Sequence, residues 1–162
     1  MKYIGKAHDN LVITENDNIS EVTEIDGYLH IKSGDHKAFN LKSVEGIRIH
    51  KNSKLTANNL KSVNGSIFIH ENANLKAKSL KHIDGALDIH ENATFKAFTL
   101  KTIKRWVTVG KNSTMKANNL KQVNSCVDVY GIFKAPNFTL KNVMGEVTVY
   151  KNATVKTKDF IY

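Results

Sequence analysis

Three histidines, His50, His70 and His90, recur at intervals of 20 residues. Imidazoles stacked at one position of a repeat could bind a transition metal, with Asp88 as a nearby carboxylate. Stacked side chains point in parallel rather than converge, and no cysteine or carboxylate recurs beside them. We therefore expect neither a metal nor a cofactor. Sensitivity to pH is the milder chemistry of such a column, because stacked imidazoles resist joint protonation.

Catalysis has little support in the sequence. Cys126 is followed two residues later by Asp128, but the residue at the histidine position of its own repeat is Tyr130. A catalytic cysteine needs a histidine within reach. The chain also has no glycine-rich phosphate loop, no paired-cysteine metal motif and no His-Glu-x-x-His. We expect a protein that is not an enzyme.

Lysines recur as regularly as the histidines. Lys+Arg exceed Asp+Glu by 24 to 15, giving a net charge of +9 that favours acidic partners. Columns of lysine could follow a phosphate backbone, or they could form a solvated face that maintains solubility. Nucleic-acid-binding proteins usually interleave lysines with arginines or stacking aromatic residues, whereas Arg48 and Arg105 lie outside the columns. Both interpretations stay open. The first column is Lys42, Lys61, Lys81, Lys101, Lys121 and Lys141, and the second is Lys76, Lys96, Lys116, Lys134 and Lys156.

A repeat of 20 residues must position these side chains. Two nearly clean copies are Leu60 to Ser79 (LKSVNGSIFIHENANLKAKS) and Leu80 to Thr99 (LKHIDGALDIHENATFKAFT). A period this short indicates one supersecondary unit per copy, which buries its apolar side only against its neighbours. About five buried aliphatic residues cannot offset the cost of ordering some 20 residues, so stability must come from the stack.

Numbering each copy from its leucine assigns the local structure. Positions 8 and 10 are β-branched or leucine and alternate with polar residues, which predicts a strand with one buried face. Positions 16 and 18 predict a second, shorter strand. Glycine at position 6 and asparagine at position 13 mark corners, because both tolerate positive φ.

The predicted fold is therefore all-β: a single-domain β-solenoid of about seven stacked coils of 19–20 residues with parallel strands. Residues 1–21 are expected to form an N-terminal cap, 22–159 the solenoid repeats, and 160–162 the C-terminal end of the last coil. Exposed strand edges at the ends leave a homodimer formed end to end as an open alternative.

The pattern Leu-x-x-Val-x-x-Ile-x-Ile-x-x-Asn-x-x-Leu, carried by residues 41–55 (LKSVEGIRIHKNSKL), resembles the leucine-rich repeat. It is also similar to short, 20-residue β-solenoid repeats of bacteria and phages. Most copies have one more residue between positions 4 and 8 than the leucine-rich pattern, and none has room for a helix. The resemblance implies a protein-binding module, by analogy of fold only.

The outward positions 7, 9 and 11 carry aromatic, histidine and arginine side chains. Large exposed apolar side chains indicate a binding surface, and Tyr, Trp and Arg are enriched in interaction hot spots. The alternative is that cross-strand pairs of these residues only stabilise the sheet. The predicted partner-binding residues are Tyr28, Arg48, His50, Phe68, His70, His90, Trp106, Tyr130 and Tyr150.

Irregular copies fall between residues 104 and 138. Arg105-Trp106 replaces the glycine corner, and the stretch from Tyr130 to Phe133 drops the corner asparagine. Departures of this kind indicate either residues that contact a partner or sequence variation that the repeat tolerates.

We expect a rigid protein-binding module, and a phage-encoded inhibitor of a host enzyme fits its size and charge. A nucleic-acid-binding solenoid that uses the lysine columns, or a self-assembling structural unit, is the alternative. A single cysteine, no secretion signal and no long apolar run predict a soluble, cytoplasmic protein of a bacterial cell or phage-infected host, without a membrane partner.

Overall fold

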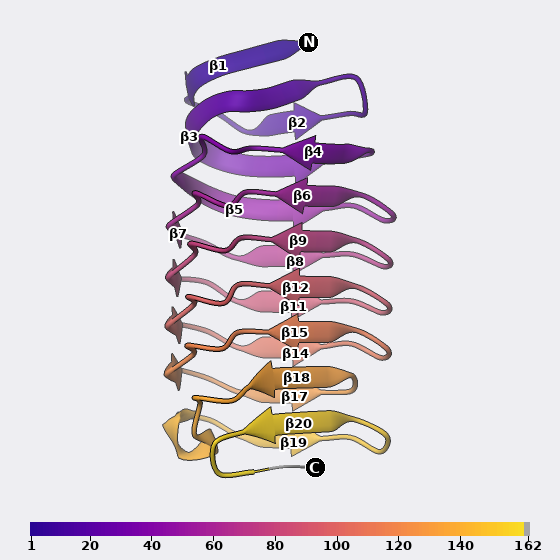
Figure 1. Cartoon of the computed structure of the whole chain (residues 1–162), viewed down its shortest axis with the longest axis vertical. Helices are drawn as coiled ribbons and strands as arrows, with labels where there is room; N and C mark the ends of the chain where they lie inside the picture. Colours follow the sequence, from indigo (N-terminus) through magenta and orange to yellow (C-terminus); the bar gives the residue numbers. More distant parts are fainter. Residues whose placement is uncertain (161–162) are drawn as a thin grey trace.

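The computed structural model describes residues 1–160, so residues 161 and 162 of the expected C-terminal end lie outside the described residues. The chain is all-β, and its parallel strands stack as a β-solenoid of about eight turns. Figure 1 shows the coils stacked along one axis, with the two ends of the chain at opposite ends of the stack. The predicted fold class is confirmed.

A 13-stranded parallel sheet covers two sides of the described stack. In the middle coils, each copy contributes a two-residue strand at positions 3 and 4 and a three-residue strand at positions 8 to 10. The strands of this sheet are β1 (Lys2–Ala7), β2 (Leu11–Ile13), β3 (Asn18–Ile31), β5 (Ser43–Ile49), β7 (Ser62–Val63), β8 (Ile67–Ile69), β10 (His82–Ile83), β11 (Leu87–Ile89), β13 (Thr102–Ile103), β14 (Val107–Val109), β16 (Gln122–Val123), β17 (Val127–Val129) and β19 (Val147–Val149).

A 7-stranded parallel sheet forms the opposite side, built from the second strand of each copy. Figure 1 shows these strands in front of the β8 to β19 row, running the other way. They are β4 (Asp35–Lys37), β6 (Lys54–Thr56), β9 (Asn74–Lys76), β12 (Thr94–Lys96), β15 (Thr114–Lys116), β18 (Ile132–Ala135) and β20 (Thr154–Thr157).

Aliphatic ladders between the sheets form the core. Leu87 lies opposite Ile67 in one neighbouring coil and Val107 in the other, and all three are fully buried. Phe95, at position 16, contributes one of the largest fully buried side chains from the 7-stranded sheet. The alternation at positions 8 and 10 therefore produces the strand with one buried face that the sequence predicts.

The first 21 residues, expected to cap the solenoid, contribute parallel strands of their own. Strand β1 pairs only with β3, and β2 also pairs with β3, so one edge of this rung faces outward among the described residues. Strand β3 is long because it continues without a break around a corner of the solenoid. From β7 and β8 onward, two separate short strands lie on either side of this corner.

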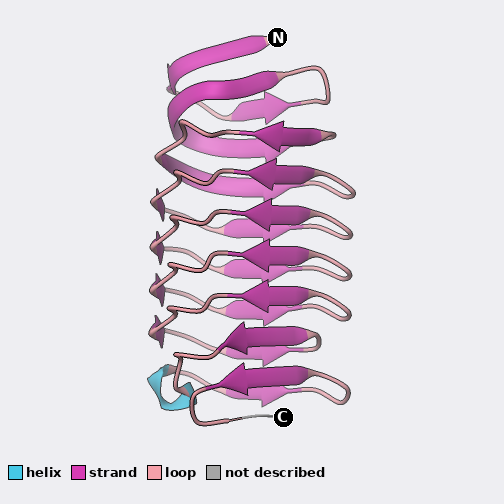
Figure 2. Cartoon of the chain, in the orientation of Figure 1, coloured by secondary structure: helices cyan, strands magenta, loops and turns pink. Residues whose placement is uncertain are grey.

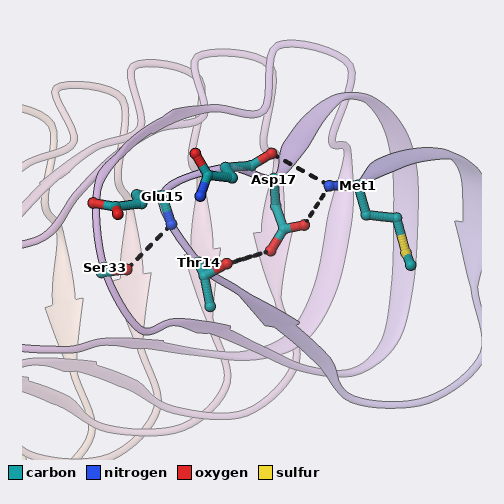
Figure 3. A network of polar contacts seen from close by, with 6 residues as sticks. Met1, Thr14, Glu15, Asp17 and Ser33 are labelled. Atoms are coloured by element: carbon teal, nitrogen blue, oxygen red, sulfur yellow. Dashed lines mark hydrogen bonds and ion pairs between the residues drawn. The ribbon is translucent and has the colours of Figure 1, made fainter.

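A polar network holds this first rung to its loop (Figure 3). The Met1 ammonium donates to Oδ1 of Asp17 over 2.8 Å, while the backbone N–H and the hydroxyl of Thr14 donate to Oδ2. These hydrogen bonds, led by that of the ammonium, lower the pKa of Asp17 to about 2. The Glu15 N–H donates to the Ser33 hydroxyl and joins the loop to the next coil.

The corner asparagines adopt the left-handed conformation that position 13 predicts. Their φ angles lie between 56° and 69°, and they are the non-glycine residues of the described chain with positive φ: Asn52, Asn72, Asn92, Asn112 and Asn152. In this conformation the backbone N–H of Asn92, for example, donates to the carbonyl of Lys111 in the next coil, over 3.0 Å. The turn thus closes each coil and joins it to its neighbour.

The corner glycines do not behave as predicted. Among the described glycines only Gly5 and Gly34 have positive φ, so position 6 does not need glycine for its backbone conformation. Space is the reason instead. A Cβ added at Gly85 would lie 2.4 Å from the carbonyl carbon of Gly65 in the preceding coil, closer than real Cβ contacts.

The last coil departs from the others. A single 3₁₀ turn, η1 (Leu140–Asn142), replaces the short strand, and only an isolated bridge between Val123 and Val143 continues the pairing there. Figure 2 shows this turn, near the C-terminus, as the one helical segment of the described chain.

The asparagine turns give a direct test of the fold. We expect Asn92→Ala to lower the free energy of unfolding by about 1 kcal/mol, because alanine lacks the short polar side chain by which asparagine tolerates the left-handed region. Asn92→Gly should lose less, because glycine adopts positive φ without a steric cost. Urea denaturation of both variants measures this difference, and equal losses would contradict the conformational explanation.

Candidate functional site

The outer side of the 13-stranded sheet carries all the residues predicted to contact a partner. In β8, β11, β14 and β17 the first and third residues are buried and the middle residue is half-buried. Positions 7, 9 and 11 therefore line one outward surface, which we call the strand face. It holds Tyr28, Arg48, His50, Phe68, His70, His90, Trp106, Tyr130 and Tyr150, all half-buried or exposed.

Four histidines form a row on the strand face, and we call it the histidine row. The ring centroids of His50 and His70 are 5.5 Å apart in a stacked arrangement, and those of His70 and His90 are 4.7 Å apart. His30, which the sequence did not place with them, lies 6.2 Å from His50. The repeat pattern did not indicate this, because His30 occupies position 9 rather than 11 and pairs in register with Arg48.

Burial and neighbouring cations disfavour the charged form of three histidines in the row. Desolvation is the main cause that lowers the pKa of His30, His50 and His70 below the usual value. Arg48 adds to this effect at all three, and Lys32 at the first two, whereas Asp88 and Glu71 oppose it at His70. Nε2 of His50 and of His70 is buried without a hydrogen-bond partner among the described residues.

The row has no metal-binding geometry. Among residues 1–160, no group of three or more His, Cys, Asp or Glu side chains is arranged to hold a metal ion. His90 has the nearest carboxylate, with Nε2 at 3.4 Å from Oδ2 of Asp88.

Two other predicted contacts lie beside the histidine row. The Arg48 guanidinium carbon is 4.9 Å from the ring centroid of Phe68 in the next coil, a cation–π distance. The Tyr28 ring covers Gly46, since a Cβ there would lie 2.3 Å from it. Both side chains are therefore partly occupied by contacts within the chain.

Three exposed aromatic residues, Trp106, Tyr130 and Tyr150, lie on the strand face near the C-terminal end, and we call them the aromatic group. Tyr130 and Tyr150 stack with centroids 3.8 Å apart and planes 14° apart. A side-chain hydrogen bond with Tyr150 is the leading cause that raises the pKa of Tyr130. Trp106, at position 7, precedes its strand, whereas Tyr130 and Tyr150, at position 11, follow theirs. Exposed fractions of 42% for Trp106, 39% for Tyr130 and 38% for Tyr150 leave much of each ring in solvent.

The first lysine column lies on a corner of the solenoid, away from the strand face. The backbone N–H of Lys81 donates to the carbonyl of Lys61, and that of Lys101 to the carbonyl of Lys81, so the column is in register. All six side chains are exposed: Lys42, Lys61, Lys81, Lys101, Lys121 and Lys141.

The second lysine column runs over the 7-stranded sheet. Lys76, Lys96, Lys116, Lys134 and Lys156 pair in register through five consecutive strands. Strands β6 to β20 of that sheet carry no acidic residue, and none of these lysines forms an ion pair within residues 1–160. Phe98, which the sequence did not single out, lines a hollow with Lys116 and Lys134.

Comparison of the chain with protein-family models, with characterised proteins and with solved structures finds no match. In the described part of the chain, no helix is long and apolar enough to cross a membrane.

The depressed histidine pKa values predict how stability depends on pH. Below about pH 6.5, the usual histidine pKa, the unfolded chain binds more protons than the folded chain, so the free energy of unfolding falls as pH falls. The combined variant His50→Gln, His70→Gln should lose part of this dependence between pH 7.5 and 5.5, a range above the titration of most carboxylates. Thermal unfolding at both pH values measures it. A variant with the same fall in midpoint as the parent chain would show that the row does not contribute.

Proposed function

We propose that this chain is a rigid, non-enzymatic protein-binding module whose strand face contacts the partner. The observation that supports it is the aromatic group: Trp106, Tyr130 and Tyr150 are held half in solvent on three consecutive rungs. Exposed aromatic side chains gain little in a monomer, whereas at the centre of an interface they become hot spots.

The scaffold suits this role because its strands are fixed on both sides. Val127 pairs with Val107 on one side and Val147 on the other, so the backbone beneath the aromatic group has little freedom left to lose on binding. Preorganisation of this kind reduces the entropic cost of association. Thr108, Asp128 and Thr148 lie between the aromatic side chains and supply polar groups for specificity.

The aromatic group would be the centre of the interface rather than all of it. A stable interface buries about 800 Å² on each partner, so contacts must continue along the strand face toward the histidine row. His30, His50 and His70, whose charged form is disfavoured, can be desolvated at a lower cost than permanently charged side chains. Blocking the surface of an enzyme is one action that a rigid body of this kind can perform.

Partner capture with matched variants tests this proposal. A tagged chain would capture partners from its native cell, with nuclease treatment, and mass spectrometry would identify them. Trp106→Ala and Tyr150→Ala should each weaken binding of the captured protein by about tenfold or more, as expected for hot-spot truncations. Phe39→Ala is the control, because Phe39 is also 42% exposed but follows β4 on the other sheet. Equal effects of all three substitutions, or none, would reject the strand face as the contact surface.

A second candidate function is the binding of a polyanion by the 7-stranded sheet. The separation of this lysine column from acidic residues favours such a function. A surface that served solubility alone could mix positive and negative side chains. Its rungs are about 4.8 Å apart, comparable to the spacing of phosphates along a nucleic-acid strand, and Phe98 offers a surface on which a base can stack.

Salt dependence distinguishes the second candidate from the first. A fluorescent single-stranded oligonucleotide should bind with an affinity that falls steeply between 50 and 200 mM salt. The variant Lys96→Gln, Lys116→Gln, Lys134→Gln should flatten the slope of log K against log salt by about 2, at roughly 0.7 per phosphate contact. An unchanged slope, or no binding at low salt, would exclude this function.

A further inference from the structure

The coil that contains β17 and β18 lacks the turn that joins the two strands in most other coils. In five coils a lysine or glutamate followed by asparagine joins the two strands, as in Lys111-Asn112, but here Tyr130 is followed directly by Gly131. Figure 1 shows that the connection from β17 to β18 ends short of the turns above and below it. The register survives the loss of two residues, because Ile132 still pairs with Thr114.

Gly131 permits this shortcut. A Cβ at this position would lie 2.3 Å from the carbonyl oxygen of Gly110, so a larger residue could not make the direct connection. The result is a notch of about 370 Å³ in the row of turns, which we call the turn notch. Lys111, Asn112, Tyr130, Gly131, Lys151 and Thr154 are among the residues that line it.

The notch leaves two backbone groups without the partners that the repeat normally supplies. In regular turns the asparagine N–H donates to the carbonyl of the following turn, as from Asn72 to Glu91 over 3.1 Å. Asn112 has the same left-handed φ of 56° as Asn92, but among the described residues its N–H has no acceptor. The carbonyl of Lys151 likewise accepts no hydrogen bond within residues 1–160.

A donor and an acceptor therefore face the notch from opposite sides. The flanking turns are two rungs apart, about 9 to 10 Å, which is the space that one intervening peptide segment occupies. A peptide inserted there can accept a hydrogen bond from the Asn112 N–H and donate one to the Lys151 carbonyl. This is the pairing by which extended segments add to exposed sheet edges.

The charges at the notch indicate the side chain of the segment. Lys111 and Lys151 flank it, and none of residues 1–160 that line it is acidic. Between one pair of successive turns, Lys51 and Glu71 form an ion pair across one rung at 2.5 Å. A carboxylate at the level of the missing turn would lie one rung from both lysines.

We infer that the turn notch receives an acidic peptide segment of the protein partner, which replaces the missing turn in backbone pairing and in charge. The notch adjoins the aromatic group through Tyr130, so it continues the surface proposed above as the interface. This inference rests on the proposed protein-binding function, whose strand face supplies the rest of the contact.

A small probe tests the notch without the partner. N-acetylglutamate N-methylamide, titrated into ¹⁵N-labelled chain, should produce saturable shifts at the amide of Asn112, with smaller ones at Gly131 and Thr154. The isosteric glutamine probe should bind several-fold more weakly, because it lacks the carboxylate. Acetate at the same concentration should not saturate the Asn112 shift. Shifts of equal size with acetate or with the glutamine probe, or no shift at Asn112, would overturn the inference.

Two variants connect the probe to the partner. Inserting glutamate and asparagine between Tyr130 and Gly131, with Gly131→Ala, rebuilds the turn; this filled-notch variant should keep the parent's thermal midpoint and lose the probe response. Lys111→Gln, Lys151→Gln keeps the notch open and should lose only the preference for the glutamate probe. If the filled-notch variant kept full affinity for a partner whose binding Trp106→Ala weakens, the strand face would be supported as the interface and the notch would be rejected. Probe binding without any loss of partner affinity in Trp106→Ala would reject the strand face alone.

Discussion

Each coil of this chain depends on hydrogen bonds to the coils above and below it. The peptide groups of one rung have their acceptors in the next, as where the N–H of Thr94 donates to the carbonyl of Ala73. The apolar side chains follow the same rule, since Leu87 is covered by the equivalent residues of two neighbours. Strict parallel pairing therefore stabilises the coils and also fixes every side chain about 4.8 Å from its equivalents along the axis.

This constraint turns each recurrent residue into a column. Inside, the columns are aliphatic; outside, they become the histidine row and the two lysine columns. Changes that keep the strands in register alter the surface without disturbing the core. The loss of two residues after Tyr130 opens the turn notch, yet Phe133 remains opposite Met115 and fully buried. Distinct surface features therefore arise on the C-terminal coils, where copies differ most.

The repeat predicts much of this structure, because periodicity reports which side of a strand is buried. Positions 8 and 10, the left-handed asparagines and the outward placement of Trp106 and Tyr130 all follow from local pattern and simple backbone preferences. The role of the position-6 glycines does not, since Gly85 is required by the approach of another coil rather than by its own φ. Such an approach depends on how closely rungs pack at a corner, which no local pattern contains.

Contacts between coils were the other part that the sequence could not supply. His30 meets His50 from a different repeat position, and Phe98 lies beside Lys116 across the coil boundary. Tyr130-Gly131 was visible as a fault in the pattern, but its consequence was not. In regular turns the asparagine N–H donates to the following turn, so the Asn112 N–H loses its acceptor when that turn is missing. The direction of this hydrogen bond depends on how the coils stack and cannot be read from the sequence.

The contact surface can be mapped directly by hydroxyl-radical footprinting of the complex with the captured partner. If the strand face forms the interface, Trp106, Tyr130 and Tyr150 lose reactivity on binding, while Phe39 and Phe98, which follow strands β4 and β12 of the other sheet, keep theirs. Protection of Phe98 with no change at Trp106 and Tyr150 would place the interface on the lysine-bearing sheet and contradict the account.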